Sequence, residues 1–378
     1  MATSKHLQPE FLITPEAIIE SAKGLTSFYG PLETITGSSD DFWTELERFC
    51  VELLQYPQAL EALSRIYANS ILDFERGLFC GMFSVLVARR LGIKKARIRS
   101  LFYAALLQDV GSYMEDYGIS DYFNIVRAKL GGKPSVSTSS QNRSHALVGS
   151  SLIEDVMSDD SLVAELVLHH HAKDDGTGYP TNVGENQLSI EQQILIVANE
   201  VSDLLAERGG FDDLYDCIAE LKLSSVMYFR EVNGAAYSLL AEAANSSHYH
   251  AQLSTSDAKA LMQLEAMCSF SANALAYSSD LLEFEHYASV RQLRALIKKL
   301  DLLMRDTGFA QALDKKCGNS VAIYLQALPN FLERIMEKLK TVQKSLPQDA
   351  ASKASDLNSE LKSLISSLKP NKAFSLFS

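Results

Sequence analysis

The chain has 378 residues, which is long enough for two or three domains and a substantial hydrophobic core. Hydrophobic residues make up 47% and charged residues 22% of it, as in an ordinary folded globular protein. The net charge of −12 repels phosphate backbones and anionic lipids, so the composition argues against a nucleic-acid-binding or membrane-surface protein. A small anionic ligand stays compatible with this charge, because it needs only a locally basic pocket.

The amino-terminal sequence, MATSKHLQPEF, lacks the basic stretch followed by an apolar one that marks a signal peptide. No apolar run approaches the roughly 20 residues that span a bilayer, so we expect a cytoplasmic protein. No two of the five cysteines have C-x-x-C spacing, and we expect buried, reduced thiols at Cys50, Cys80, Cys217, Cys268 and Cys317.

The sequence of residues 12–70 predicts a series of helices. Thr14 and Pro15 form a helix start, with a capping side chain followed by proline at the first helical position. The segment 40–56 predicts a helix whose apolar residues share one face, because they recur at spacings of four, three and four: Phe42, Leu46, Phe49 and Leu53.

Residues 71–106 predict two more helices, separated at Leu91-Gly92, and the second of them, near 96–108, is apolar enough to be buried on all sides. The polar stretch 131–144 predicts a long loop. Further helices are predicted at 145–157, 160–171 and 190–207, and no segment shows the alternation of a strand. The sequence therefore predicts an all-α fold.

The last third of the chain carries apolar residues in a regular three-four spacing, which indicates helices that bury one face against a partner helix. Pro347 interrupts the spacing, so the helices on either side of it are expected to form an antiparallel hairpin. Two interpretations stay open, an intramolecular bundle or a surface that binds a second copy or a signalling protein. The residues are Val290, Leu293, Ile297, Leu300 and Met304, then Leu325, Leu328, Leu332, Ile335, Leu339, Val342 and Leu346, and finally Leu357, Leu361, Leu364 and Leu368.

Three consecutive histidines, His169, His170 and His171, stand at a predicted helix end. Adjacent side chains on a helix point about 100° apart, so at most two of the three can converge on one point without local unwinding. Imidazoles together with a nearby carboxylate suit zinc, iron, manganese or nickel. Taken alone, such a cluster is more often solvated surface than a metal site.

The spacing of several motifs makes a metal site more plausible than the histidines alone do. The stretch HHAKDDGTGYP at 170–180 combines two histidines with a Gly-Tyr-Pro turn, and AALLQDVGS at 104–112, His145 with Gly149, and QQILIVANEVSDLL at 192–205 stand at matching positions. In order and spacing, residues 73–205 resemble the HD-GYP family of metal-dependent phosphodiesterases that act on cyclic di-GMP. The motif loop of that family corresponds here to Asp175, Gly176, Gly178, Tyr179 and Pro180.

The resemblance implies two groups of metal ligands. The group shared with other HD proteins falls on Asp73, Gln108, Asp109 and Asn199, where only Asp109 has the expected residue type. The second group is complete, with ligands expected at Asp109, His145, His170 and His171. A family lysine that meets a substrate phosphate is replaced by Ser112.

These replacements have chemical consequences. Gln108 offers a neutral amide oxygen in place of an imidazole, and Asn199 lacks the negative charge of an aspartate. Asp73, as a carboxylate, remains a competent ligand for a hard metal ion. We therefore expect one divalent transition-metal ion or none, and impaired hydrolysis, because generating a hydroxide in this family relies on two ions. Rival phosphate contacts are Lys129 and Lys133, with Arg127 and Arg143 nearby, and ordinary solvated charges are an equal alternative.

Three functions follow. The leading one is a degenerate HD-GYP signalling protein that binds a cyclic dinucleotide, such as cyclic di-GMP, or a protein partner. The alternatives are an active cyclic di-GMP phosphodiesterase with an atypical ligand set, in which Asp109 is catalytic, and a structural helical scaffold with a vestigial pocket. The expected domains are an amino-terminal helical segment at 1–70, an HD-GYP-like domain at 71–235 and a carboxy-terminal helical bundle at 236–378.

Overall fold

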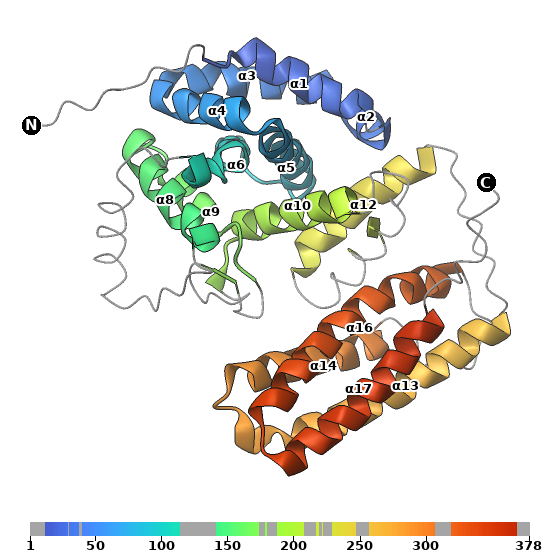
Figure 1. Ribbon diagram of the computed structural model, residues 1–378. Coiled ribbons are helices and arrows are strands. Elements are labelled where there is room, and N and C mark those ends of the chain that lie inside the picture. Colours follow the sequence, from blue (N-terminus) through green and yellow to red (C-terminus); the bar gives the residue numbers. More distant parts are fainter. Residues whose placement is uncertain are drawn as a thin grey trace, which may run out of the picture. The chain divides into compact units, whose positions relative to one another are not determined.

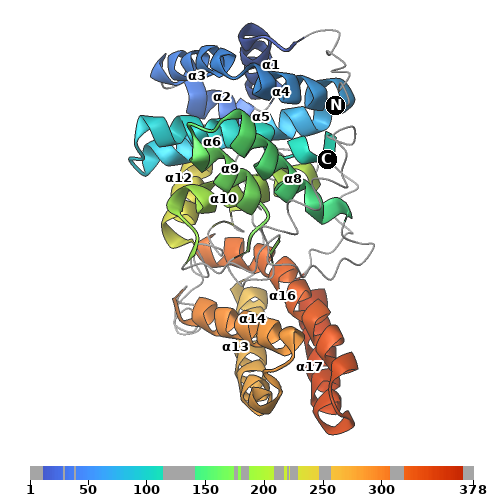
Figure 2. The ribbon, with the colours of Figure 1, turned by 90° about the vertical axis from the view of Figure 1, so that its left-hand side faces the viewer.

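The computed structural model describes residues 12–28, 30–37, 40–113, 141–173, 178–179, 187–207, 217–218, 221, 229–246, 257–306 and 319–368. Every regular element within these ranges is a helix (Figures 1 and 2), which confirms the predicted all-α fold. The chain divides into two compact units, residues 1–214 with 234–249 and residues 215–233 with 250–378. The domain boundaries at 70 and 235 stay predictions.

The first unit begins with four helices in the region predicted to be helical, α1 (Pro15–Phe28), α2 (Gly30–Gly37), α3 (Asp40–Glu52) and α4 (Pro57–Asn69), with the 3-10 turn η1 (Leu53–Gln55) between the last two. The backbone N–H of Ala17 donates to Thr14 Oγ1 at 3.2 Å, so Thr14 caps α1 as its sequence position predicts. The predicted apolar face of α3 is buried, with Phe42, Leu46, Phe49 and Leu53 each at most 1% exposed.

Helices α5 (Ile71–Arg90) and α6 (Lys95–Leu107) form the centre of this unit, with α1 and α4 packed on one side and α9 (Ser161–His169) and α10 (Ile190–Glu207) on the other (Figure 1). The chain reverses between α5 and α6 at Gly92, whose φ of 70° lies in the left-handed region that glycine adopts without strain. Every residue of α6 from Ser100 to Leu107 is buried, as the apolar run predicts.

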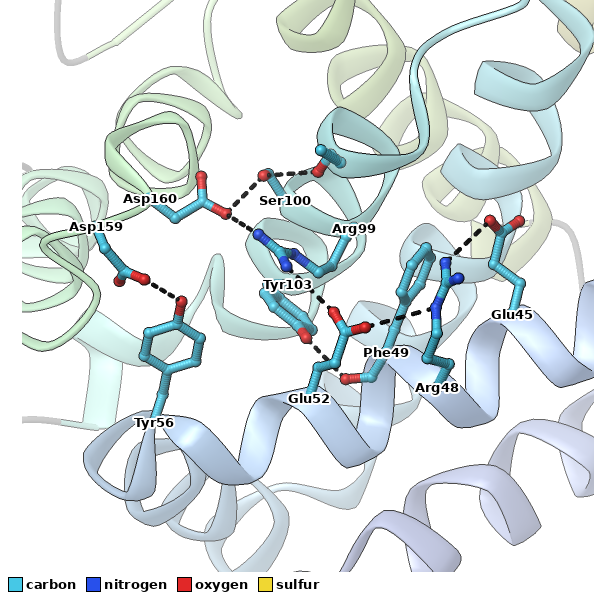
Figure 3. A network of polar contacts seen from close by, with 11 residues as sticks. Glu45, Arg48, Phe49, Glu52, Tyr56, Arg99, Ser100, Tyr103, Asp159 and Asp160 are labelled. Atoms are coloured by element: carbon cyan, nitrogen blue, oxygen red, sulfur yellow. Dashed lines mark hydrogen bonds and ion pairs between the residues drawn. The ribbon is translucent and has the colours of Figure 1, made fainter.

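A polar network ties the amino-terminal helices to this centre (Figure 3). Arg99 of α6 forms ion pairs with Glu52 at 3.1 Å and with Asp160 at 3.5 Å. The hydroxyl of the fully buried Tyr103 donates to the carbonyl oxygen of Phe49 at 2.7 Å. A buried hydrogen bond of this kind fixes the orientation of α6 against the end of α3, because leaving either group unpaired would be unfavourable.

Helix α8 spans Gln141–Val156, so it begins four residues earlier than the helix predicted at 145–157. The loop predicted at 131–144 therefore ends too late, because residues 141–144 belong to this helix. Residues 131–140 lie outside the described part. Polar residues at a helix start are ordinary, and the composition alone could not separate them from the loop. The first unit also includes α12 (Arg230–Ser246) from Gly234 onward, and Glu242 of this helix pairs with Arg90 of α5 at 2.7 Å.

The second unit contains α13 (Asp257–Asp280), the 3-10 turn η6 (Leu282–Phe284), α14 (Ala288–Asp306), α16 (Asn319–Ser345) and α17 (Gln348–Leu368). Helix α13 packs against α14 and α17, and α16 packs against the same two helices, so the four form a bundle (Figure 2). The turn at Pro347 joins α16 to α17 in the predicted hairpin.

The apolar seams of the last third face the interior of this bundle. All but two of the residues predicted for them are buried, from Val290 to Leu368. The exceptions are Leu346, which is partly exposed, and Leu325, whose side chain lies outside the described part. The intramolecular interpretation therefore accounts for the spacing, and the seams give no reason to invoke a second chain. None of the helices in the described part combines the length and apolar composition that a bilayer span requires.

Candidate metal centre

The close approach of the backbone at Gly111 to the backbone of α8 places Asp109 at the site. Asp109 lies between the end of α6 and the 3-10 turn η2 (Val110–Tyr113). A Cβ on Gly111 would lie 2.1 Å from the carbonyl oxygen of His145 and 2.7 Å from the backbone nitrogen of Gly149, both on α8. Only glycine permits this contact, which sets the carboxylate of Asp109 beside the imidazole of His145.

Four side chains from three elements converge on one point. Their ligand atoms all lie within 4.8 Å of one another, and the residues are the predicted Asp109, His145, His170 and His171. The Nε2 atom of His145 lies 3.2 Å from Nε2 of His170 and 3.1 Å from Nε2 of His171. Asp109 Oδ1 lies 3.6 Å from Nε2 of His145 and 3.9 Å from Nε2 of His170.

The end of α9 gives the two histidines this arrangement. The helix stops at His169, and His170 and His171 lie in the turn that follows, so both imidazoles face the same point. His169 points elsewhere, with its Nδ1 2.9 Å from Nε2 of Gln192. This agrees with the expectation that only two of the three can converge.

Each imidazole of this turn has a neighbour that fixes it. His170 Nδ1 lies 2.6 Å from the carbonyl oxygen of Val167, so it donates there and presents the lone pair of Nε2 to the cluster. The ring of Tyr179 stacks on His171 at a centroid distance of 4.5 Å. A Cβ on Gly178 would lie 2.5 Å from the carbonyl oxygen of His171, so glycine lets the motif loop fold back over the histidine. These loop residues therefore support the site.

Burial sets the charge state of the cluster. It lowers the pKa of His170 well below its ordinary value and lowers the pKa of His171 to about 3, so both rings are neutral at pH 7. Burial also raises the pKa of the Asp109 carboxyl, against the attraction of His145. Neutral imidazoles with free Nε2 lone pairs are the form that binds a metal ion.

The donor set fits a divalent transition metal. At a metal–nitrogen distance of about 2.1 Å, neighbouring ligands of a tetrahedral or octahedral ion are about 3.0–3.4 Å apart. The Nε2 atom of His145 has this separation from Nε2 of His170 and of His171, and Asp109 Oδ1 lies slightly further out, at 3.6 and 3.9 Å. Three imidazoles and one carboxylate suit zinc, iron, manganese or nickel.

The side chains of Gln108 and Asn199 are hydrogen-bonded to each other. Gln108 Nε2 donates to Asn199 Oδ1 at 3.0 Å, and Asn199 Nδ2 donates to Gln108 Oε1 at 2.8 Å and to the Leu195 carbonyl at 3.0 Å. The two residues are 1% and 5% exposed. The thiol of Cys80 also contacts Asn199 Oδ1, at 3.5 Å. The amides thus satisfy one another and form a closed, neutral pair.

Asp73 is not one of the four clustered residues. Its carboxylate accepts a hydrogen bond from the hydroxyl of Tyr113 in η2. A second α5 side chain whose charge acts on Asp109 is Arg76, one turn further on, which pairs with Asp203 of α10 at 2.8 Å. Sequence reasoning missed Arg76, although its three-residue distance from Asp73 puts both on neighbouring positions of one helix face.

The remaining predicted residues contribute less. Ser112 is exposed in η2, and its backbone N–H donates to the carbonyl of Asp109 at 2.9 Å. Of the predicted thiols, Cys50, Cys80 and Cys217 are buried and free, Cys268 is free and partly exposed, and Cys317 lies outside the described residues. Also outside them lie Arg127, Lys129, Lys133, Asp175, Gly176 and Pro180, and the side chain of Arg143.

Comparison with known proteins identifies the fold around this centre. A family model described as an HD domain matches residues 79–221. Residues 79–221 are therefore similar to an HD domain. It is 26% identical over 176 residues to a cyclic di-GMP phosphodiesterase of Pseudomonas aeruginosa, covering 46% of this chain and 36% of that protein. It is also 26% identical over 188 residues to a cyclic di-GMP phosphodiesterase of Thermotoga maritima, covering 49% of this chain and 47% of that protein.

The matches confirm the resemblance drawn from the sequence. The chain spans less than half the length of these curated relatives. No solved structure gives a significant match. Within the HD domain, the histidine and aspartate cluster is the part of the described structure whose geometry suits a metal ion.

Proposed function

We propose that this HD-domain protein binds a cyclic dinucleotide of the cyclic di-GMP type at a centre holding a single divalent metal ion, and that it hydrolyses this ligand slowly or not at all. One observation carries the proposal. A complete cluster of three imidazoles and a carboxylate lies beside two amides that are already bonded to each other.

The ligand class comes from the relatives, both of which are named cyclic di-GMP phosphodiesterases. An ion held by His145, His170, His171 and Asp109 would polarise a phosphoryl oxygen and lower the pKa of a bound water. The protein orients the site, because the backbone carbonyl of Val167 fixes His170 and the ring of Tyr179 fixes His171.

The weak hydrolysis follows from the amide pair. An amide has no proton to release near neutral pH and no negative charge to balance a second cation. Both amide oxygens of Gln108 and Asn199 already accept hydrogen bonds, so binding an ion there would break a buried, satisfied pair. The burial of the apolar seams inside the second unit gives no separate support to a partner-docking role.

The test measures metal content, ligand binding and turnover on the full chain. We expect about one manganese, iron or zinc ion per chain, cyclic di-GMP binding by calorimetry that depends on this ion, and little turnover. His170→Ala should lose the ion and the binding. His169→Ala is the matched control, because the imidazole of His169 contacts Gln192 and lies outside the cluster. This variant should keep the ion and the dinucleotide binding.

Two results would contradict the proposal. Rapid hydrolysis of cyclic di-GMP that is abolished by Asp109→Ala would identify an active phosphodiesterase instead. A full chain that binds neither a metal ion nor the dinucleotide after anaerobic purification would favour a structural scaffold with a vestigial pocket.

A further inference from the structure

A cavity of about 370 Å³ lies between α3, the end of α5 and the start of α6. Three cations from these three helices line it, Arg48, Arg89 and Lys95, against two carboxylates, Asp41 and Glu45. Asp41 is exposed, so water screens its charge. The cavity is therefore locally basic, although the net charge of the chain is −12. A small anion needs a pocket of this kind in an acidic protein.

The turn between α5 and α6 brings two of the cations to the cavity. The N–H of Ile93 donates to the Ala88 carbonyl and that of Gly92 to the Arg89 carbonyl, both at 3.0 Å. These are the two hydrogen bonds of a Schellman motif, which the left-handed Gly92 completes. Because this turn is short and hydrogen-bonded, Arg89 at the end of α5 and Lys95 at the start of α6 line the same cavity.

The three cations share one carboxylate, and none forms a short hydrogen bond with it. Glu45 is 9% exposed, and its Oε1 lies 3.5 Å from Nη2 of Arg48 (Figure 3). The other two distances are 3.8 Å to Nε of Arg89 and 3.9 Å to Nζ of Lys95. Arg48 also lies 3.5 Å from Glu52. All four distances exceed the roughly 2.7–2.9 Å of a strong charged hydrogen bond, so these cations keep donor capacity for a further anion.

Two sets of donors at this cavity have no acceptor among the side chains nearby. The Nη1 atom of Arg89 is buried, and none of the described residues accepts a hydrogen bond from it. Buried donors in folded proteins are nearly always paired, so this atom suits an acceptor brought by a ligand. At the start of α6, the side chain of the N-cap residue Lys94 forms no capping hydrogen bond. The first N–H groups of a helix carry a partial positive charge that also favours an anion.

We propose that this cavity is a second ligand site of the chain and binds a phosphate group through Arg48, Arg89 and Lys95. A tetrahedral phosphate suits donors that come from three helices, because it offers acceptor oxygens in more directions than a planar carboxylate does. The cavity also has an apolar wall, formed by Ile93 and Ile98, against which the organic part of a phosphorylated small molecule can pack.

The proposed site is separate from the candidate metal centre. Lys95 is the first residue of α6, and Asp109 follows the last turn of the same helix. At 1.5 Å per residue, the two positions are about 20 Å apart along the helix axis. The inference therefore does not depend on the proposed function, and phosphate should bind here whether or not the centre holds a metal ion.

The test uses the full chain stripped of metal with a chelator, and inorganic phosphate is titrated by calorimetry at low salt. Removing metal ions keeps the candidate metal centre out of the measurement. Arg90→Met is the matched control, because Arg90 follows Arg89 on α5 and its loss changes the net charge equally. The Arg90 guanidinium is paired outside the cavity, with two hydrogen bonds of 2.8 and 2.7 Å to Glu242.

The wild-type chain and Arg90→Met should bind one phosphate with equal affinity. Arg89→Met should bind it at least about tenfold more weakly, because it loses a buried charged donor. Lys95→Met should bind about threefold more weakly, since Lys95 is 77% exposed and solvent screens its charge. Glu45→Gln should bind phosphate more tightly, because it removes the carboxylate that competes for the same three cations.

Phenyl phosphate and acetate complete the set of probes. Tighter binding of phenyl phosphate than of inorganic phosphate would assign the site to an organic phosphate, and the reverse order would assign it to the free ion. Either order supports a phosphate site. Acetate that binds as tightly as phosphate would contradict the assignment of the ligand class.

Three results with phosphate would overturn the inference. The first is a metal-free wild-type chain that shows no saturable binding, which leaves the proposed function intact because metal content and dinucleotide binding are measured separately. The second is an equal loss of affinity in Arg90→Met and Arg89→Met, since binding would then follow net charge alone. The third is an unchanged affinity in Lys95→Met, which decides the matter if Arg89→Met does not fold, because an exposed side chain is replaced at little cost to stability.

Discussion

The pair formed by Gln108 and Asn199 makes a quantitative prediction about stability. Replacing Asn199 with leucine removes the three hydrogen bonds with Gln108 and Leu195 and the weaker one from the Cys80 thiol, and it leaves both amide atoms of Gln108 buried without partners. Because each orphaned buried group costs about 1–3 kcal/mol, Asn199→Leu should lower the free energy of unfolding by about 2–4 kcal/mol. Gln108→Leu should cost about 1–3 kcal/mol, because Asn199 keeps its bond to the Leu195 carbonyl.

The double variant separates this explanation from others. Removing both amides together leaves no orphaned partner, so Gln108→Leu/Asn199→Leu should lie within about 1–2 kcal/mol of the wild type and show a coupling energy of about 2 kcal/mol or more. The ion content should stay at the wild-type value, because neither amide belongs to the cluster.

The chain offers a convenient probe for this cycle. Trp43 is its single tryptophan and lies on α3 of the first unit, so its fluorescence in urea reports the unit that contains the amide pair. Losses that simply add, within about 0.5 kcal/mol, would refute the idea of a mutually satisfied pair. A loss of bound metal in the double variant would show that the amides take part in ion binding.

Three further predictions concern the backbone contact, the stacked tyrosine and the second unit. Gly111→Ala should destabilise the first unit by about 3 kcal/mol or more and abolish metal binding, because its Cβ would meet the His145 carbonyl at 2.1 Å; an unchanged urea midpoint would contradict this. Tyr179→Ala should weaken metal affinity about tenfold in a chelator competition assay by freeing His171, whereas Tyr179→Phe keeps the ring and should match the wild type. Burial lowers the pKa of Lys299 to about 8, so the unfolded state binds more protons between pH 8 and about 10.5 and stability rises with pH there. The gain in melting temperature from Lys299→Met should therefore be largest at pH 7 and shrink toward pH 10, and a pH-independent difference would exclude this explanation.

Local patterns account for the parts of the fold that the sequence predicts well. The break at Gly92 and the cap at Thr14 depend on the conformational preferences of one or two residues, and both appear in the structure. The seams of the last third contain enough regular spacing to predict helices, but the spacing is the same whether the partner helix is in the same chain or another. Only the packing of α13, α14, α16 and α17 settles that choice.

The ligand cluster was predictable for a different reason. His170 and His171 are adjacent in sequence, and Asp109 and His145 belong to motifs of fixed spacing, so the resemblance selects four residues whose ligand atoms the fold brings together. The amide pair was not predictable as a pair, because Gln108 and Asn199 are 91 positions apart and each, taken alone, stands at one replaced ligand position. Their hydrogen bonds exist only once α6 and α10 are packed.

The rotation of α5 explains the error over which residue faces the centre. Asp73 and Arg76 are three positions apart, so both fit an interior helix face in the sequence. Phe74 and Leu78 are both at most 1% exposed, and burying them turns Asp73 toward Tyr113 and Arg76 toward Asp203. This rotation depends on the surrounding core, which a helical periodicity of about 3.6 residues cannot specify to one position.

The same rotation decides which substitutions could create a second metal site. Gln108→His with Asn199→Asp and Asp73→His restores three metal-binding side chains, but it retains the positive charge of Arg76, which acts on Asp109, and places the new imidazole of residue 73 near Tyr113. We expect this triple variant to bind one ion per chain, because the fixed positive charge repels a second. Replacing Asp73→His by Arg76→His removes that charge and presents an imidazole on the helix face toward Asp203, so this variant should bind close to two ions. Two ions in the variant that retains Arg76 would refute this electrostatic explanation, because the guanidinium would then tolerate a second cation.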